Sequence, residues 1–124
     1  MRFIGKIDRK IYSCISEVIL DDEVIITEER IAHIKERHPD DFERYCDFLC
    51  KIVEQPDYII QSNKPNTALI LKGFAEENDF KTVLRLRTSG DDPRFKKSII
   101  TFMRINKKEW NRLLRNKPIL YKRE

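Results

Sequence analysis

The segment with the clearest structural signal reads Thr27-Glu-Glu-Arg-Ile-Ala-His-Ile-Lys-Glu-Arg-His-Pro39. Thr27 is a good helix N-cap, and the two glutamates after it favour the positive end of a helix dipole. Pro39 disfavours helical geometry in the residue before it. We therefore predict a helix that begins after Thr27 and ends at Arg37 or His38.

The segments on either side of this helix predict a mixed fold. A short β-branched run at 23–27 predicts a strand before the helix, and apolar spacings of three and four over 42–53 predict a second helix after it. Strands are then expected at 58–61, 67–74, 80–88 and 98–105, followed by a helix capped by Asn106 and a last strand at 118–121. The predicted fold class is α+β, with N-terminal helices packed on a four- to five-stranded antiparallel sheet and a short C-terminal helix. A single domain is expected over 1–124.

Two of the predicted strands alternate in polarity. In the strand at 80–88, Val83, Arg85 and Arg87 should lie on one side, opposite to Thr82, Leu84 and Leu86. In the strand at 98–105, the odd-numbered residues from Ile99 to Ile105 should lie on one side. The two arginines predict a positively charged sheet face that is able to hold phosphate, and the alternative is an ordinary solvated sheet face.

Charge is distributed unevenly along the chain. The net charge of +4 combines an acidic segment, 17–57, which has thirteen acidic and five basic residues, with a basic segment, 94–124, which has eleven basic and two acidic residues. The basic segment suits a polyanion such as nucleic acid. The acidic segment would repel that ligand unless it faces away, and an alternative is that the two segments simply attract one another.

The composition predicts a soluble, cytoplasmic protein. No segment approaches the roughly 20 apolar residues of a membrane span, and the first residues lack the apolar run of a secretory signal. Cys14, Cys46 and Cys50 have no framework spacing, which indicates free thiols.

The only two histidines, His33 and His38, lie on the first predicted helix. At 100° per residue, His33 shares a stripe with Arg30 and Arg37, whereas His38 lies near the core side at the helix end. Imidazole suits general acid–base catalysis near neutral pH. The alternatives are a helix C-cap for His38 and an ordinary surface position for His33.

A zinc site is a competing hypothesis. Cys46 and Cys50 lie four residues apart, downstream of both histidines. Both cysteines also flank the apolar face of the second helix, where free thiols are commonly buried. We expect no metal and no cofactor.

The segment Ile26–Pro39 resembles the opening helix of the phage-Barnase-EndoU-ColicinE5/D-RelE-like nucleases. The likeness continues through Gln55-Pro-Asp-Tyr-Ile59, Asn63-Lys-Pro-Asn-Thr-Ala68, Leu84-Arg-Leu-Arg-Thr-Ser89, Ser98-Ile-Ile-Thr-Phe102 and the tail from Arg115, and it looks closest to the third phage subgroup. The resemblance implies helices against a four-stranded antiparallel sheet, with the active site on the sheet face. It also implies an endoribonuclease that needs no metal and leaves a 2′,3′-cyclic phosphate.

The resemblance also supplies the candidate site and partners. The positions that match the family motif are His33, His38, Asn66, Thr67, Arg85, Thr88 and Thr101. The predicted catalytic residues are His33, His38, Arg85, Thr88 and Thr101, and the predicted substrate-binding residues are Arg30, Arg37, Lys64, Asn66, Thr67, Arg87 and Ser98. The expected partners are RNA, with tRNA among the candidates, and an immunity protein or antitoxin. The alternative function is a non-catalytic RNA-binding or partner-binding module of phage or mobile-element origin.

Overall fold

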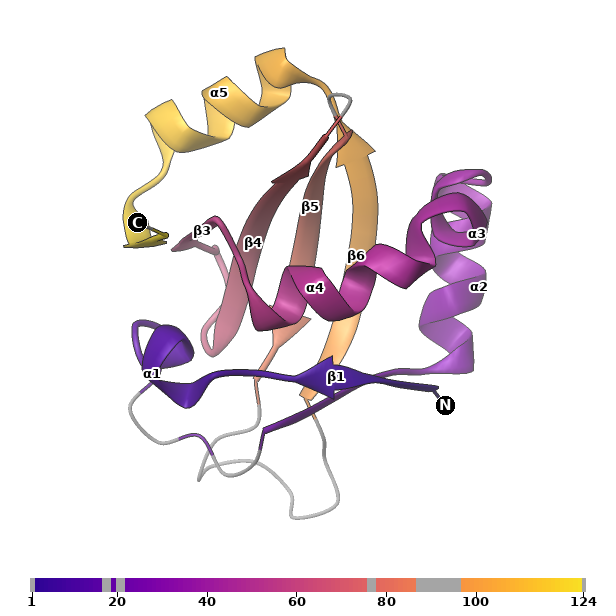
Figure 1. Ribbon diagram of the computed structural model, residues 1–124, viewed down its shortest axis with the longest axis horizontal. Coiled ribbons are helices and arrows are strands. Elements are labelled where there is room, and N and C mark those ends of the chain that lie inside the picture. The colour runs from indigo at the N-terminus through magenta and orange to yellow at the C-terminus, as the bar shows by residue number, and fades with distance from the viewer. Residues whose placement is uncertain (1, 17–18, 20–21, 76–77, 87–96, 124) are drawn as a thin grey trace.

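The computed structural model describes residues 2–16, 19, 22–75, 78–86 and 97–123. Within these residues, seven strands form one sheet in the order β1-β2-β6-β5-β4-β3-β7 (Figure 1). The strands are β1 (Arg2–Lys6), β2 (Glu23–Ile26), β3 (Tyr58–Gln61), β4 (Thr67–Phe74), β5 (Asn78–Arg85), β6 (Lys97–Ile105) and β7 (Ile119–Lys122). The helices are α1 (Arg9–Tyr12), α2 (Glu28–Arg37), α3 (Asp41–Tyr45), α4 (Leu49–Glu54) and α5 (Lys107–Asn116), and a 3-10 turn, η1 (Cys46–Phe48), joins α3 to α4.

The α+β class is confirmed, but the predicted sheet of four to five antiparallel strands was too small. The sheet gains β1 and β2 at one edge and β7 at the other. It is also mixed, because β2 runs parallel to β6, with Val24 paired to Lys97 and Ile25 to Ser98. Residues 24 to 26 are fully or nearly buried, so joining the large sheet hides an apolar segment that a free strand would expose to water.

The ends of α2 lie where the sequence predicts them. The hydroxyl of Thr27 accepts a hydrogen bond from the backbone N–H of Arg30 at 3.2 Å. His38 is the C-cap, and its backbone N–H donates to the carbonyl of Ile34 at 2.7 Å. Ile31 and Ile34 are buried, so this helix packs through one apolar stripe.

The second predicted helix is broken into α3, η1 and α4. Its apolar residues are buried nonetheless, including Phe42, Leu49 and Ile52. The break allows Phe48 to stack on Phe74 of β4, with ring centroids 4.6 Å apart. Aromatic packing against the sheet therefore overrides the single continuous helix that the apolar spacing predicts.

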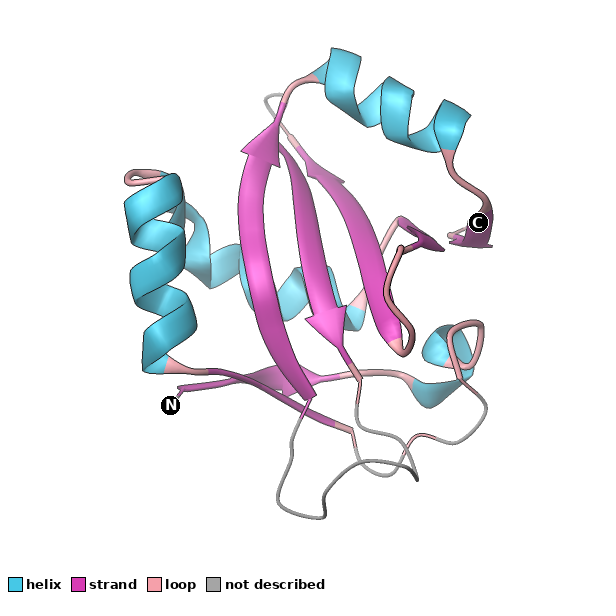
Figure 2. Cartoon of the chain, turned by 180° about the vertical axis from the view of Figure 1, so that it is seen from behind, coloured by secondary structure: helices cyan, strands magenta, loops and turns pink. Residues whose placement is uncertain are grey.

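The two faces of the sheet are covered differently. Helices α2, α3 and α4 pack with one face to form the main core, in which Phe80, Leu84 and Phe102 are fully buried. On the other face, Trp110 and Leu113 of α5 pack in a smaller apolar cluster that includes Leu71. Among the described helices, α5 lies over one end of this face (Figure 2), and we call the remainder the open face.

The alternation predicted for β5 is confirmed over its described residues, but strict alternation in β6 was wrong. Val83 and Arg85 line the open face of β5, while Leu84 belongs to the main core. In β6, Ile99 pairs with Leu84 and Thr101 with Val83, so Ile100 is an extra residue in a β-bulge. The bulge shifts the face on which the following side chains lie.

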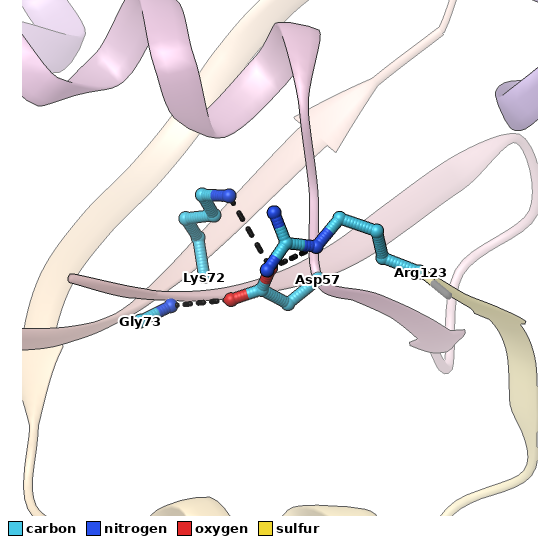
Figure 3. Close-up of polar contacts among 4 residues, drawn as sticks. All are labelled: Asp57, Lys72, Gly73 and Arg123. Atoms are coloured by element: carbon cyan, nitrogen blue, oxygen red, sulfur yellow. Dashed lines mark hydrogen bonds and ion pairs between the residues drawn. The ribbon is translucent and has the colours of Figure 1, made fainter.

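An ion-pair cluster around the buried Lys72 joins the segment after β7 to the sheet (Figure 3). The Oδ1 atom of Asp57 lies 3.2 Å from Nζ of Lys72 and 3.0 Å from Nε of Arg123. Its Oδ2 atom accepts a hydrogen bond from the backbone N–H of Gly73 at 2.9 Å. Because the Lys72 side chain is only 6% exposed, Asp57 supplies the countercharge that its ammonium needs.

Candidate nucleic-acid interface

The open face of the sheet carries a pocket of about 720 Å³. Its floor is formed by β4, β5 and β6, and Figure 2 shows these strands between α2 on one side and α5 on the other. The first turn of α2, the turn after β3 and the inner side of α5 form its walls. No helix in the described part of the chain is long and apolar enough to cross a membrane.

Strand register brings three predicted site residues into one row across the pocket floor. Thr67 of β4 pairs with Arg85 of β5, and Arg85 pairs with Ser98 of β6. In the next row, Leu69 pairs with Val83, and both line the pocket beside Ile100. The floor therefore offers polar and charged groups next to an apolar strip, a combination that suits the phosphate and the base of a nucleotide.

Arg85 is held in place by the backbone around it. Its Nη1 atom donates to the carbonyl of Leu86 and, at 3.4 Å, to the carbonyl of Asn66. The backbone N–H of Leu86 donates to the same Asn66 carbonyl at 2.8 Å. Asn66 has a φ of 54°, a left-handed conformation that asparagine tolerates better than most residues. This turn thus fixes the position of the arginine relative to β4.

The pocket is strongly positive. Of the described residues that line it, Glu29 alone is acidic, and six are basic: Arg30, Lys64, Lys81, Arg85, Arg112 and Lys117. Side chains that gather one sign of charge in a concave site focus the potential and attract a polyanion. Some of this charge is already paired, because Arg112 forms an ion pair with Glu109 and its hydrogen bond lowers the pKa of the Glu109 carboxyl.

The structure brings together five of the predicted site residues in this pocket. They are Arg30, Lys64, Thr67, Arg85 and Ser98. Asn66 lines a neighbouring polar pocket instead. Thr101 pairs with Val83 in the sheet but does not line the basic pocket. The predicted residues Arg87 and Thr88 lie outside the described residues.

The two histidines occupy different places. His33 is exposed and lines a shallow depression beside the pocket, which shares Glu29 and Arg30 with it. His38 caps the far end of α2, about 15 Å of helix away from the first turn, and the exposed Arg37 lies beside it. Of the two histidines, His33 is therefore the one placed next to the pocket.

Four charged residues of the pocket are absent from the site predicted from the sequence. Lys81 could have been found, because strand alternation places it on the same side as Val83 and Arg85. Glu29 was interpreted only as a helix-dipole residue, although it lines both the pocket and the depression with His33. Arg112 and Lys117 come from the C-terminal region, and no local pattern connects them with β5.

The cysteines lie apart from the basic pocket. Cys50 Sγ lies 3.2 Å from Oε1 of Glu54, and partial burial together with this carboxyl raises the pKa of the thiol. Cys46 lines a depression with Cys50 near Phe3 and Phe42. Among the residues that the structure describes, no three His, Cys, Asp or Glu side chains are grouped so that they could hold a metal ion.

A basic pocket on an open sheet face is an electrostatic feature typical of proteins that bind nucleic acid. The family model described as phage-Barnase-EndoU-ColicinE5/D-RelE like nuclease2 matches residues 2–122, and the chain belongs to this nuclease family. The family predicted from the sequence is therefore confirmed, although the matching model is nuclease2 whereas the likeness pointed to the third phage subgroup. No curated protein and no solved structure matches the chain.

Proposed function

We propose that this protein is a metal-independent endoribonuclease whose active site is the basic pocket. The observation that carries the proposal is the row of Thr67, Arg85 and Ser98 beneath a wall of basic side chains, in a chain that belongs to a nuclease family. The substrate is an RNA segment, with tRNA among the candidates. An acidic immunity protein or antitoxin would fit the same positive surface.

The proposed reaction is transfer of the phosphodiester to the neighbouring 2′-hydroxyl. A base removes the hydroxyl proton, O2′ bonds to phosphorus, and the bond from phosphorus to the 5′-oxygen breaks. The departing oxygen receives a proton from an acid, which leaves a 2′,3′-cyclic phosphate. In this proposal Arg85 and Lys81, which both line the pocket, stabilise the extra negative charge on phosphorus.

Glu29 and His33 are the proposed acid–base pair. Glu29 is the one acidic residue among the described residues that line the pocket. It also lines the adjoining depression with His33, which lies one turn further along α2. A carboxylate is able to take the 2′-hydroxyl proton, and an imidazolium is able to protonate the leaving oxygen. The reaction needs two acid–base groups at one site. His38 caps the far end of α2, so it does not provide the second group beside His33, and Glu29 would take that role.

The first prediction is that purified protein cleaves unstructured RNA or total tRNA in the presence of EDTA. The new 3′ ends should carry a 2′,3′-cyclic phosphate, which mass spectrometry or enzymatic end-labelling detects. Salt-dependent RNA binding that leaves the RNA intact would contradict the proposal and favour the non-catalytic binding module.

The second prediction concerns the proposed base. Glu29→Gln should lower kcat for RNA cleavage by roughly 100-fold with little change in KM, because the amide keeps the shape of the side chain but cannot accept the proton. Glu43→Gln is the matched control, since Glu43 is an exposed residue of α3, paired at the surface with Lys35, on the other side of the sheet. Unchanged kcat in Glu29→Gln would remove Glu29 from the mechanism.

A further inference from the structure

A second pocket, of about 400 Å³, adjoins the basic one across the turn that follows β3. The two pockets share Ser62, Asn63, Lys64 and Thr67, so this turn forms the ridge between them. An RNA strand whose phosphate lies beside Arg85 would meet this ridge directly, because Thr67 pairs with Arg85 and also lines the second pocket.

The lining of the second pocket differs from that of the first. Of its described lining residues, Lys64 alone is charged, whereas Gln61, Asn63 and Asn66 carry amides. Ile15 and Leu120 add apolar surface. Amides present a donor and an acceptor side by side, which complements the edge of an unpaired base, and apolar side chains suit its flat face. The pocket is large enough for a purine.

Asn66 is the best-placed of these amides. Its backbone carbonyl is already used, because it accepts the hydrogen bonds of Leu86 and Arg85. Within the described part of the chain, no hydrogen bond occupies its side-chain amide. By contrast, Asn63 Oδ1 accepts a hydrogen bond from Lys117 at 3.4 Å. The same residue therefore positions the arginine of the first pocket through its backbone and also lines the second pocket, where its side-chain amide has no hydrogen-bond partner among the described residues.

We infer that the second pocket binds the unpaired nucleobase next to the cleaved phosphate, and that the Asn66 amide selects that base. This inference rests on the proposed ribonuclease function. It extends that function by assigning sequence preference to the turn after β3 rather than to the basic pocket.

The test separates the role of the Asn66 backbone, which positions Arg85, from the role of its side chain, which is proposed to bind the base. Asn66→Gly is compatible with the left-handed conformation and removes the side chain that carries the amide. We expect the ratio of cleavage after the preferred base to cleavage after the other bases, measured at the mapped sites, to fall by about tenfold or more. Asn66→Asp also tolerates the conformation and replaces the amide donor by an acceptor, so it should change which base is preferred. Asn111→Ala, which removes an exposed amide from α5, should leave the preference unchanged.

Binding of the four nucleoside 3′-monophosphates, measured by titration calorimetry or NMR, provides a readout that needs no catalysis. Wild-type protein should discriminate among the four bases, and Asn66→Gly should lose that discrimination. If the wild-type protein fails to cleave RNA yet shows this Asn66-dependent discrimination, the ribonuclease proposal fails and the base site stands. Base preference that is absent, or that is unchanged in both Asn66 variants, overturns the base site.

Discussion

Arg85→Ala is expected to lower kcat for RNA cleavage by about 100-fold or more, because it removes a positively charged guanidinium that is held in place on the floor of the pocket. Arg85 is half-buried, and the carbonyls of Leu86 and Asn66 orient its guanidinium. A pre-positioned group of this kind needs little reorganisation when charge develops on phosphorus. Steady-state cleavage of a fluorescent oligoribonucleotide measures the effect.

Two variants make this result interpretable. Arg85→Lys keeps the charge but loses the forked geometry, so it should recover only part of the lost rate. Arg44→Ala removes an exposed arginine from α3, which packs on the opposite face of the sheet, and should leave the rate unchanged. Thermal unfolding of each variant separates loss of catalysis from loss of fold. Wild-type activity in folded Arg85→Ala would show that the active site lies elsewhere.

Asp57→Ala is expected to lower the free energy of unfolding by about 3 kcal/mol or more. The substitution leaves the ammonium of Lys72 buried without its countercharge and also removes the acceptor of the Gly73 N–H (Figure 3). It releases the side chain of Arg123 as well, which weakens the attachment of the C-terminal segment. Urea unfolding followed by circular dichroism measures the change.

Lys72→Met supplies the control for this cluster. In the double variant, Asp57→Ala and Lys72→Met together remove both members of the buried pair, so much of the stability should return. Asp22→Ala breaks the exposed pair with Arg9 and should cost well under 1 kcal/mol by comparison. If Asp57→Ala is no worse than Asp22→Ala, the Asp57 carboxylate does not stabilise the fold as proposed.

The elements with strong local signals were predictable from the chain. Helix α2 begins after Thr27 and ends before His38, because the capping hydroxyl and the proline act within a few residues. Strands β3 and β4 lie where the β-branched and turn residues place them. The broken helix between Asp41 and Glu54 was not predictable, since its irregular middle depends on the contact between Phe48 and Phe74.

The size of the sheet and the composition of the pocket depend on long-range pairing. The parallel pairing of β2 with β6 joins segments about 70 residues apart, and no local pattern specifies it. The same is true of the contact of Arg112 and Lys117 with the pocket that contains Lys81. The basic segment 94–124 predicted a nucleic-acid ligand. It did not show that Lys81 and Arg85 would line the pocket, because they belong to the segment 58–93, which has five basic and five acidic residues.

Local features of the sequence were sufficient to predict the family, the α+β class, the limits of α2 and a basic sheet face that contains Arg85. These properties follow from capping, periodicity and motifs, each of which acts over a few residues. The packing of the sheet placed Glu29, His33 and Arg30 beside that face and left His38 at the far end of α2. Helix geometry shows how two histidines differ in direction, but only the strands packed against the helix determine which of them adjoins a pocket.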